Sequence, residues 1–457
     1  HLLLRDAAYQ LLLRRDRTLL HARVAEALVT TFPAIGEALP HVVAIQWNEA
    51  GDFARAAAAW DRAGEQAAGR SAYSEAIDHF TKAIAANTRC EEGAERDERE
   101  FTYRMKLSAA LIAAHGFSAE GVAQEMEKAA ALSLKLGSAA RLVPALTGRW
   151  VVAGGSGDFR LLLDLALQVS RAAENGSAVD RLLAHRVLGT SLLFTGQFRP
   201  AFRELEQFVG LYDRERDDRE LSKIGPSNHA LMTMVGLAEI HTLFEEFEAA
   251  DRWMLRVLQV AREGGQAHNL CNALMFCGCF LPALRREEGD IAACAAELKA
   301  ISLQQKLPYW LGHAELFGGL ALIRHGSIDE GFIEARRGMK QIIASNAFMN
   351  GPYILYAEAC LEAGRTDEGR QSLEHAKLSI EGGQTWLEAE YHRVRARLDW
   401  MEDGASAARK SFETALRIAE TQGARLFAAR AAKELADLQE AASGGVLLKQ
   451  EPRKYLH

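Results

Sequence analysis

Apolar residues recur at spacings of three and four along almost the whole chain, often with alanine between them. This spacing places apolar side chains on one face of an α-helix, and the two-residue alternation that is typical of strands is nearly absent. Short breaks rich in Gly, Asp or Ser separate the helical segments. We therefore predict an all-α protein that consists of antiparallel helical hairpins.

The hairpins share one template, which is clearest around the predicted turn at Gly196. Its positions there are Leu188, Gly189, Leu192, Phe198, Ala201, Leu205 and Phe208. Small residues let two helix axes approach closely, and large residues fill the space against the next hairpin. This arrangement of small and large residues about a turn is the tetratricopeptide template.

The same spacing of small and large residues after a turn recurs along the chain. The further positions are Phe53, Ala56, Trp60 and Ala63; Tyr73, Ala76, Phe80 and Ala83; Phe247, Ala250, Met254 and Val257; Ile291, Cys294, Leu298 and Ile301; Ile328, Gly331 and Ala335; Gly369, Leu373 and Ala376; and Ala408, Phe412 and Ala415. The turns at Gly289, Gly326 and Gly364 are 37 and 38 residues apart. Because the standard repeat is about 34 residues long, we expect longer helices and a degenerate α-solenoid.

The repeat pattern also divides the chain. We expect the first hairpins over residues 39–90, degenerate helical repeats over 91–180, the main array over 181–440, and a frayed tail over 441–457. Charged residues of both signs crowd residues 91–100 and 213–220, which we interpret as exposed linkers or solvated helix starts. Residues 154–158, rich in glycine, are expected to form a loop.

Composition narrows the class of protein. Of 457 residues, 49% are hydrophobic and 25% are charged, with a formal net charge of −7. A mildly acidic chain without a basic face is a poor candidate for direct binding of nucleic acid. The longest apolar stretch, residues 271–284, is too short to span a bilayer.

Cellular context follows from the cysteines and from the start of the chain. The six cysteines, Cys90, Cys271, Cys277, Cys279, Cys294 and Cys360, are scattered over helical patterns. They favour buried thiols in a reducing cytoplasm over a disulfide framework. The chain begins at His1 directly in a helical pattern, without a signal segment, which predicts a piece of a longer protein.

No sequence motif for catalysis or for a cofactor emerges. The Gly-rich residues 154–157 follow no strand and lack the lysine of a phosphate loop, and Gly155-Ser156-Gly157 does not complete a nucleophile elbow. No HExxH helix is present. We therefore expect no catalytic, cofactor-binding or metal-binding residues in this chain, and no enzymatic activity of its own.

One group of residues resembles a metal site by composition. His268, Cys271, Cys277 and Cys279 lie close together in the sequence. On a helix, however, Cys277 and Cys279 point about 200° apart, so they cannot share one ion without breaking the helix. Small buried helical thiols are the favoured interpretation.

Several histidines and aromatic residues occupy template positions. His241 falls where the template places a core aromatic residue, and His185 and His392 fall at a first-helix position, so packing is favoured over ligand binding. Trp310, His313 and Tyr353 lie near first-helix starts, where such arrays often expose residues to the concave face. Core packing remains the favoured role for the aromatics.

Seven stretches together resemble the C-terminal region of large bacterial signalling proteins. These proteins carry a class III adenylate/guanylate cyclase or another output domain, then a signal-transduction ATPase (AAA/STAND) module, then a degenerate tetratricopeptide array. The stretches are residues 1–9 (HLLLRDAAY), 20–28, 49–64, 111–137, 185–212, 386–395 and 415–438. The sequence departs from the family pattern at residues 225–228 and 427–432.

The resemblance implies that residues 1–38 end a winged-helix or helical region that follows an absent ATPase module. It implies a protein-interaction and sensor region that regulates an upstream ATPase and nucleotide cyclase. A partner protein, a peptide or a small-molecule inducer would bind the concave face, and the upstream domains would be partners in cis. ATP and Mg are expected only for those upstream domains. The alternative is the sensor array of a STAND-type transcription regulator whose DNA-binding domain lies outside this chain.

Overall fold

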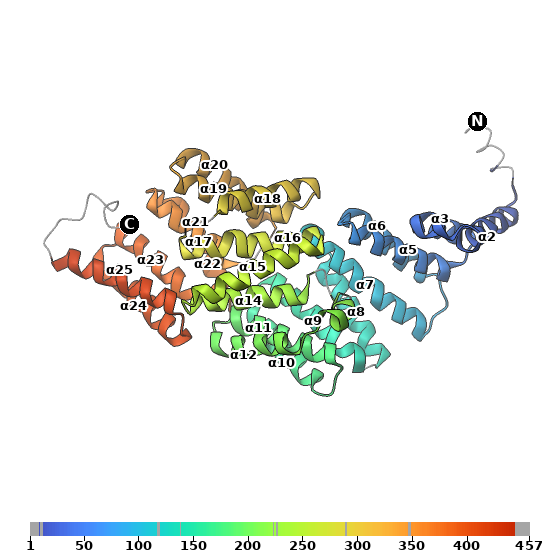
Figure 1. The fold of residues 1–457 in the computed structure, drawn as a ribbon, viewed down its shortest axis with the longest axis horizontal. Helices are drawn as coiled ribbons and strands as arrows, with labels where there is room; N and C mark the ends of the chain where they lie inside the picture. Colours follow the sequence, from blue (N-terminus) through green and yellow to red (C-terminus); the bar gives the residue numbers. More distant parts are fainter. Residues whose placement is uncertain are drawn as a thin grey trace. The chain divides into compact units, whose positions relative to one another are not determined.

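The computed structural model is a series of α-helices joined by short turns (Figure 1). The structure describes residues 9, 12–116, 119–137, 139–222, 224, 227–287, 290–345 and 349–443, and no strand occurs in these residues. The predicted all-α class is therefore confirmed. The chain forms two compact units: residues 1–114 with 120–141, and residues 115–119 with 142–457.

Unit 1 contains the N-terminal helices. They are α2 (Arg14–Thr30), α3 (Pro33–Ala38), α4 (Pro40–Glu49), α5 (Phe53–Gly69), α6 (Tyr73–Asn87), α7 (Ala94–His115) and α8 (Val122–Leu136). The template residues Ala56, Trp60 and Ala63 of α5 are buried, as are Ala76 and Phe80 of α6. These residues join two apolar clusters, which supply the core of this unit.

Unit 2 contains the long repeat array. Its helices are α9 (Ala139–Ser156), α10 (Phe159–Ala173), α11 (Ala178–Phe194), α12 (Phe198–Leu211), α13 (Arg214–Leu221), α14 (His229–Leu243), α15 (Phe247–Gly264), α16 (Ala267–Ala273), the π-helix η1 (Leu274–Phe280), α17 (Leu281–Arg285), α18 (Ile291–Gln304), α19 (Pro308–Arg324), α20 (Ile328–Ala344), α21 (Asn350–Glu362), α22 (Thr366–Glu381), α23 (Glu388–Glu402), α24 (Ala405–Gln422) and α25 (Arg425–Ser443). Its hairpins have the predicted phase, with Phe198, Ala201, Leu205 and Phe208 all buried along α12.

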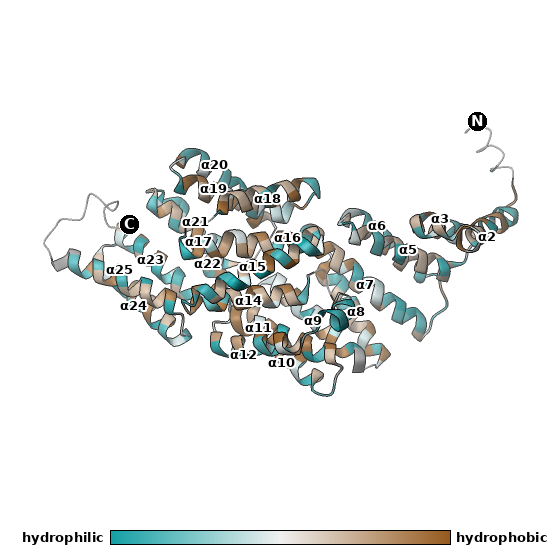
Figure 2. Ribbon diagram, in the orientation of Figure 1, coloured by the Kyte–Doolittle hydropathy of each residue, from teal (hydrophilic) through white to brown (hydrophobic). Residues whose placement is uncertain are grey.

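The two helices of each hairpin in unit 2 differ in how they are buried. Helix α15 buries one stripe, Ala250, Met254, Val257 and Ala261, whereas α14 buries consecutive residues from Val235 to Ile240 and so is covered on every side. We call α11, α14, α16–η1–α17, α19, α21 and α23 the inner helices. Figure 2 shows the amphipathic pattern as alternating hydrophilic and hydrophobic bands along the helices. An inner helix that is enclosed on all faces needs partners for every polar side chain it carries.

Glycines set the closest helix contacts. A Cβ atom at Gly189 would lie 2.5 Å from Leu205 Cδ2, so the small template position does let α11 and α12 approach closely. In the α19–α20 hairpin, a Cβ atom at Gly319 would lie 2.5 Å from both Ala335 N and Gly331 O. Such backbone-to-backbone approach excludes any larger residue.

Two sequence-based expectations are wrong. Gly154, Gly155 and Ser156 complete α9 instead of forming a loop, because the turn begins only at Gly157, whose φ is +79°. Ile328, a template position, is 48% exposed because it begins α20 at the rim of the hairpin. Residues 1–8, Gly225, Pro226, Gly289 and the tail from 444 lie outside the described residues, so the predictions for them stay untested.

In unit 2, turns from the later part of the sequence form hydrogen bonds with turns from the earlier part. Phe159 N donates to Gly382 O at 2.9 Å, and Thr385 N donates to Phe194 O at 2.9 Å. Gly382 also approaches so closely that a Cβ atom there would lie 2.4 Å from Gly157 O. The turns that flank α10 and α11 are therefore fastened to the segment between α22 and α23, which closes the repeat array upon itself.

Candidate functional site

The inner helices at the C-terminal end carry a network of charges that is buried at its centre and reaches the surface at Arg286 and Glu362. Its members are Arg286, Glu358, Glu362, Glu390, Arg393, Arg397, Arg430 and Glu434, which we call the inner network. They come from α21, α23, α25 and the residue after α17, so the network links elements that are far apart in the sequence. Its four arginines and four glutamates balance in charge.

Arg393 is the centre of the inner network and is 0% exposed. Its guanidinium donates from Nε to Glu390 at 2.8 Å, from Nη1 to Glu434 at 2.7 Å, and from Nη2 to Glu358. Burial alone would raise the pKa of Glu358, but Arg393 and the neighbouring arginines outweigh it and hold that pKa well below its usual value. Every carboxylate in the inner network has a cationic partner, so the network has a structural role and holds these helices together.

Arg186 on α11 differs from the network because no carboxylate among the described residues forms an ion pair with it. It is 7% exposed, its Nε atom is buried without a hydrogen-bond partner, and burial lowers its pKa to about 10. A pKa of about 10 still leaves the guanidinium charged at neutral pH. The Arg186 Cζ atom lies over the ring of Trp150 at 5.3 Å from its centroid.

Two neighbours complete the surroundings of Arg186. Trp150 of α9 is held in place because its Nε1 atom donates to Ser191 Oγ at 2.8 Å. His229, the first residue of α14, is buried with both ring nitrogens unpartnered. Burial, followed by the charge of Arg186, lowers the pKa of His229 well below its usual value, so the ring is neutral. We call Trp150, Arg186 and His229 the Arg186 site.

Glu239 is a second buried group without a partner. It lies in α14, is 3% exposed, and its Oε1 atom accepts no hydrogen bond. Burial raises the pKa of Glu239 to about 8, so the carboxyl is mostly protonated at neutral pH. The same carboxyl raises the pKa of Cys277, after the larger effect of burial on that thiol. Glu239 therefore faces η1 from α14.

The cysteines are free, and Cys271, Cys277, Cys279 and Cys360 are buried as the sequence predicted, whereas Cys90 and Cys294 are only half-buried. Burial raises the pKa of all four thiols. The two thiols have different neighbours, since Glu239 of α14 affects Cys277 and Cys294 of α18 affects Cys279. Within the described residues, no group of three or more His, Cys, Asp or Glu side chains could hold a metal ion.

The predicted packing of histidines and aromatics is largely observed. His241 packs edge-on against Phe202 at 5.3 Å, and His185 pairs with Glu204 through Nδ1 at 2.8 Å. Trp310, His313 and Tyr353 are buried and lie in contact with other rings, so they belong to the core of the inner helices. His392 lies against Tyr391.

Sequence reasoning missed the Arg186 site, Glu239 and the inner network. A usable signal was present, since Arg186 directly precedes Val187 and Glu239 interrupts an apolar run from Leu231 to Ile240. A helix that is apolar on all faces is enclosed in the fold, so a charged residue in it is buried as well. That residue either meets an oppositely charged partner there or is buried without one. Which of the two applies depends on distant helices, and the sequence does not give their positions.

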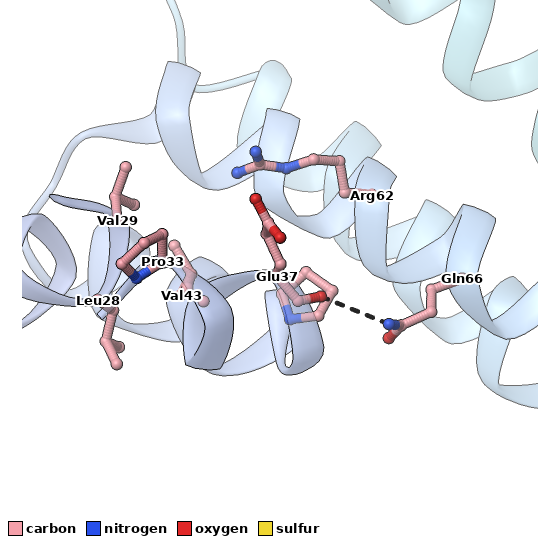
Figure 3. Close-up of a pocket in the computed structure, with 9 residues that line it drawn as sticks. Leu28, Val29, Pro33, Glu37, Val43, Arg62 and Gln66 are labelled. Atoms are coloured by element: carbon pink, nitrogen blue, oxygen red, sulfur yellow. Dashed lines mark hydrogen bonds between the residues drawn. The ribbon is translucent and has the colours of Figure 1, made fainter. Parts of the chain in front are cut away.

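Unit 1 contains a shallow pocket of about 190 Å³ between α2, α3, α4 and α5 (Figure 3). Its polar groups include Glu37 and Arg62, both exposed, and Gln66 Nε2 donates to Glu37 O at 3.4 Å. Exposed charges of this kind are hydrated and screened, so the pocket offers a bound ligand little beyond what water offers.

One helix of the described chain, residues 267–285 across α16, η1 and α17, is long and apolar enough to cross a membrane by length and composition. This helix is longer than the 271–284 stretch judged from sequence, because it includes the polar start of α16. In the fold, 94% of its apolar window is buried. It occupies the position of an inner helix, which accounts for its apolar character.

Comparison with known proteins gives distant matches. No family model matches the chain. It is 23% identical to "Uncharacterized protein R02095" of Rhizobium meliloti (strain 1021), over 96% of this chain and 43% of that protein. A Rap protein, solved in complex with competence and sporulation factor, matches 85% of this chain and 98% of its own at 11% identity, with a TM-score of 0.49. The P58(IPK) TPR domain matches 94% and 99% at 14% identity, with a TM-score of 0.27. The chain thus spans less than half the length of its Rhizobium relative.

Proposed function

We propose that this chain is the sensor and interaction region of a longer bacterial signalling protein, and that it regulates an upstream ATPase and nucleotide cyclase in the cytoplasm. The single observation that carries the proposal is the contrast within unit 2. The inner network is fully paired, whereas Arg186, on the same layer of helices, forms no ion pair with any described residue and has a buried Nε atom without a partner. A buried cation without a counter-ion is costly, so it favours binding of an anionic ligand.

The closure of unit 2 gives such a ligand something to act on. Hydrogen bonds between Phe194 and Thr385, and between Phe159 and Gly382, join the turns next to α10 and α11 to the segment between α22 and α23. A ligand on α11 and α14 that fits one curvature of the array better than another would shift the balance between closed and open states. The change in curvature is what an attached output domain would sense.

Helix α2 supports a contact with an upstream domain. Its side chains Leu19, Leu20 and Val24 are exposed, and so are Phe32 and Ile35 next to it. Exposed apolar groups gathered in this way mark interaction surfaces. In this proposal the surface packs against the module that precedes residue 1.

The test compares this chain with the longer gene product that contains it. Residues 1–457 alone are expected to have no ATPase or cyclase activity, and the longer protein is expected to have at least one of them. Removal of this region should change that basal activity several-fold. Activity in the isolated chain, absence of both activities from the longer protein, or equal activity with and without the region would each overturn the proposal.

The alternative of a transcription regulator has the same sensor region with a different output. Binding of a DNA operator by the longer protein, in place of cyclase activity, would favour it.

A further inference from the structure

Within the part of the chain that the structure describes, Arg186 has no carboxylate partner, and its Nε atom is buried without a hydrogen-bond partner. Burying an ion in a protein costs more free energy than a desolvated cation–π contact contributes. Contact with Trp150 therefore does not offset the burial of this guanidinium. Arg393 and Arg397, which are buried more deeply than Arg186, both pair with glutamates in this same fold.

We infer that Trp150, Arg186 and His229 form a binding site for the carboxylate of a ligand whose remaining body is apolar. This inference rests on the proposed function and names the chemistry of the ligand that the sensor region receives. The guanidinium supplies the charge and a planar fork of donors, which matches a carboxylate in geometry. His229 supplies one N–H from its unpartnered ring.

The surroundings favour one negative charge over two. The site has a single cation, because His229 is neutral beside Arg186. A carboxylate would neutralise that cation, whereas a phosphate dianion would leave an unpaired negative charge in an apolar region. His229 also begins α14, a helix of 15 residues whose N-terminus favours an anion.

Apolar residues surround these polar groups. Leu183 and Val187 flank Arg186 on α11, and Ala230 follows His229 on α14. All three belong with Trp150 to one hydrophobic cluster of unit 2, against which Met234 also packs. A ligand held there would bury its non-ionic part among these side chains, which favours an aliphatic or aromatic body.

The test measures binding to the 457-residue chain by calorimetry and by the shift of its melting temperature. The probes are benzoate and hexanoate, with benzamide and hexanamide as uncharged counterparts. A second arm uses a short peptide that ends in leucine, as the free acid and as the amide. We expect an acid to bind and its amide not to bind. The arm that binds distinguishes a free organic acid from a peptide C-terminus.

Variants separate the site from general effects. Arg186→Gln should weaken binding of the acid at least about tenfold, because a charge-assisted hydrogen bond is lost. The variant should still fold, since it removes an unpaired buried charge. Arg181→Gln changes an exposed arginine on the same helix and should bind like the original chain. Arg186→Lys keeps the charge without the fork and should bind more weakly than the original.

Failure of both acid arms at millimolar concentration, or equal binding by Arg186→Gln and the original chain, would overturn the inference. Neither result would change the outcome of the activity comparison between the longer protein and its truncated form. Conversely, equal activity in that comparison would overturn the proposed function, and a measured carboxylate site would remain valid.

Discussion

The Nη2 atom of Arg430 lies 2.6 Å from the carbonyl oxygen of Leu284, which precedes it by 146 residues. The same guanidinium donates from Nη1 to Glu390 at 2.7 Å. One side chain of the last helix thus joins the end of α17 to α23. The array is fastened across its interior as well as between neighbouring hairpins, unlike an open solenoid in which each repeat contacts only the next.

Replacing Arg393 with methionine should strongly destabilise unit 2. The change leaves Glu358, Glu390 and Glu434 buried with fewer cations, which costs on the order of 3–5 kcal/mol. Urea unfolding followed by circular dichroism measures the loss. The matched control is Arg409→Met, since Arg409 pairs only with Glu413 on the surface of α24 and should change stability by less than about 0.5 kcal/mol. Equal effects of the two variants would contradict the role of the inner network.

Glu239 should make stability depend on pH. Its folded pKa, about 8, is raised above the ordinary value of 4.5, so its contribution to stability is fully present below the ordinary pKa and is lost as the pH rises through 8. A shift of this size corresponds to roughly 3–5 kcal/mol.

The variant Glu239→Gln cannot ionise and should flatten the decline in stability between about pH 5 and pH 8. Melting temperatures across that range measure the effect. Glu248→Gln, an exposed change on α15, is the control and should keep the slope of the original chain. A slope that survives in Glu239→Gln would show that another group carries the pH dependence.

Gly319→Ala should disrupt the α19–α20 hairpin. The added methyl would lie 2.5 Å from two backbone atoms of α20, and overpacking of this kind costs about 1–3 kcal/mol. Gly210→Ala, at an exposed position of α12 with no atom within 4 Å of the new methyl, should instead stabilise by up to about 1 kcal/mol through helix propensity. The pair can be compared by urea midpoints, and a loss of stability in both variants would argue against a special role for close packing at Gly319.

The reactivity of the thiols should depend on how deeply each one is buried. A thiol reagent should leave Cys271, Cys277, Cys279 and Cys360 unmodified in the native chain, because they are buried and their pKa values are raised. Cys90 and Cys294, which are partly accessible, should react first. Mass spectrometry of the labelled chain reads the pattern, and rapid labelling of Cys277 would contradict the enclosed position of η1.

The sequence predicted those parts of the fold that depend on local spacing. The stripe of Phe198, Ala201, Leu205 and Phe208 and the small residue Gly189 are set by helix geometry within one hairpin, so they could be found without coordinates. The closure of unit 2 depends on curvature accumulated over many hairpins. Small differences in packing angle at each step decide whether Thr385 reaches Phe194, and no short pattern encodes that sum.

The candidate site could not be predicted from the sequence for the same reason. Arg186 and Arg393 both occupy inner helices, and only Glu390, three residues before Arg393, indicates in the local sequence that Arg393 is paired. The rest of the difference arises because α21 and α25 bring Glu358 and Glu434 to Arg393, whereas no described residue forms an ion pair with Arg186. Pairing across distant helices is a property of the assembled array.

The hydrogen bond between Phe159 and Gly382 also affects how the chain matures during synthesis. A ribosome must add more than two hundred residues after Phe159 before its partner exists. Early hairpins can form as they emerge, but Arg393 and Arg397 on α23 gain the partner Glu434 only when α25 has been translated. A nascent chain interrupted before α25 would carry these buried cations with one carboxylate fewer, which favours binding by chaperones and early proteolysis.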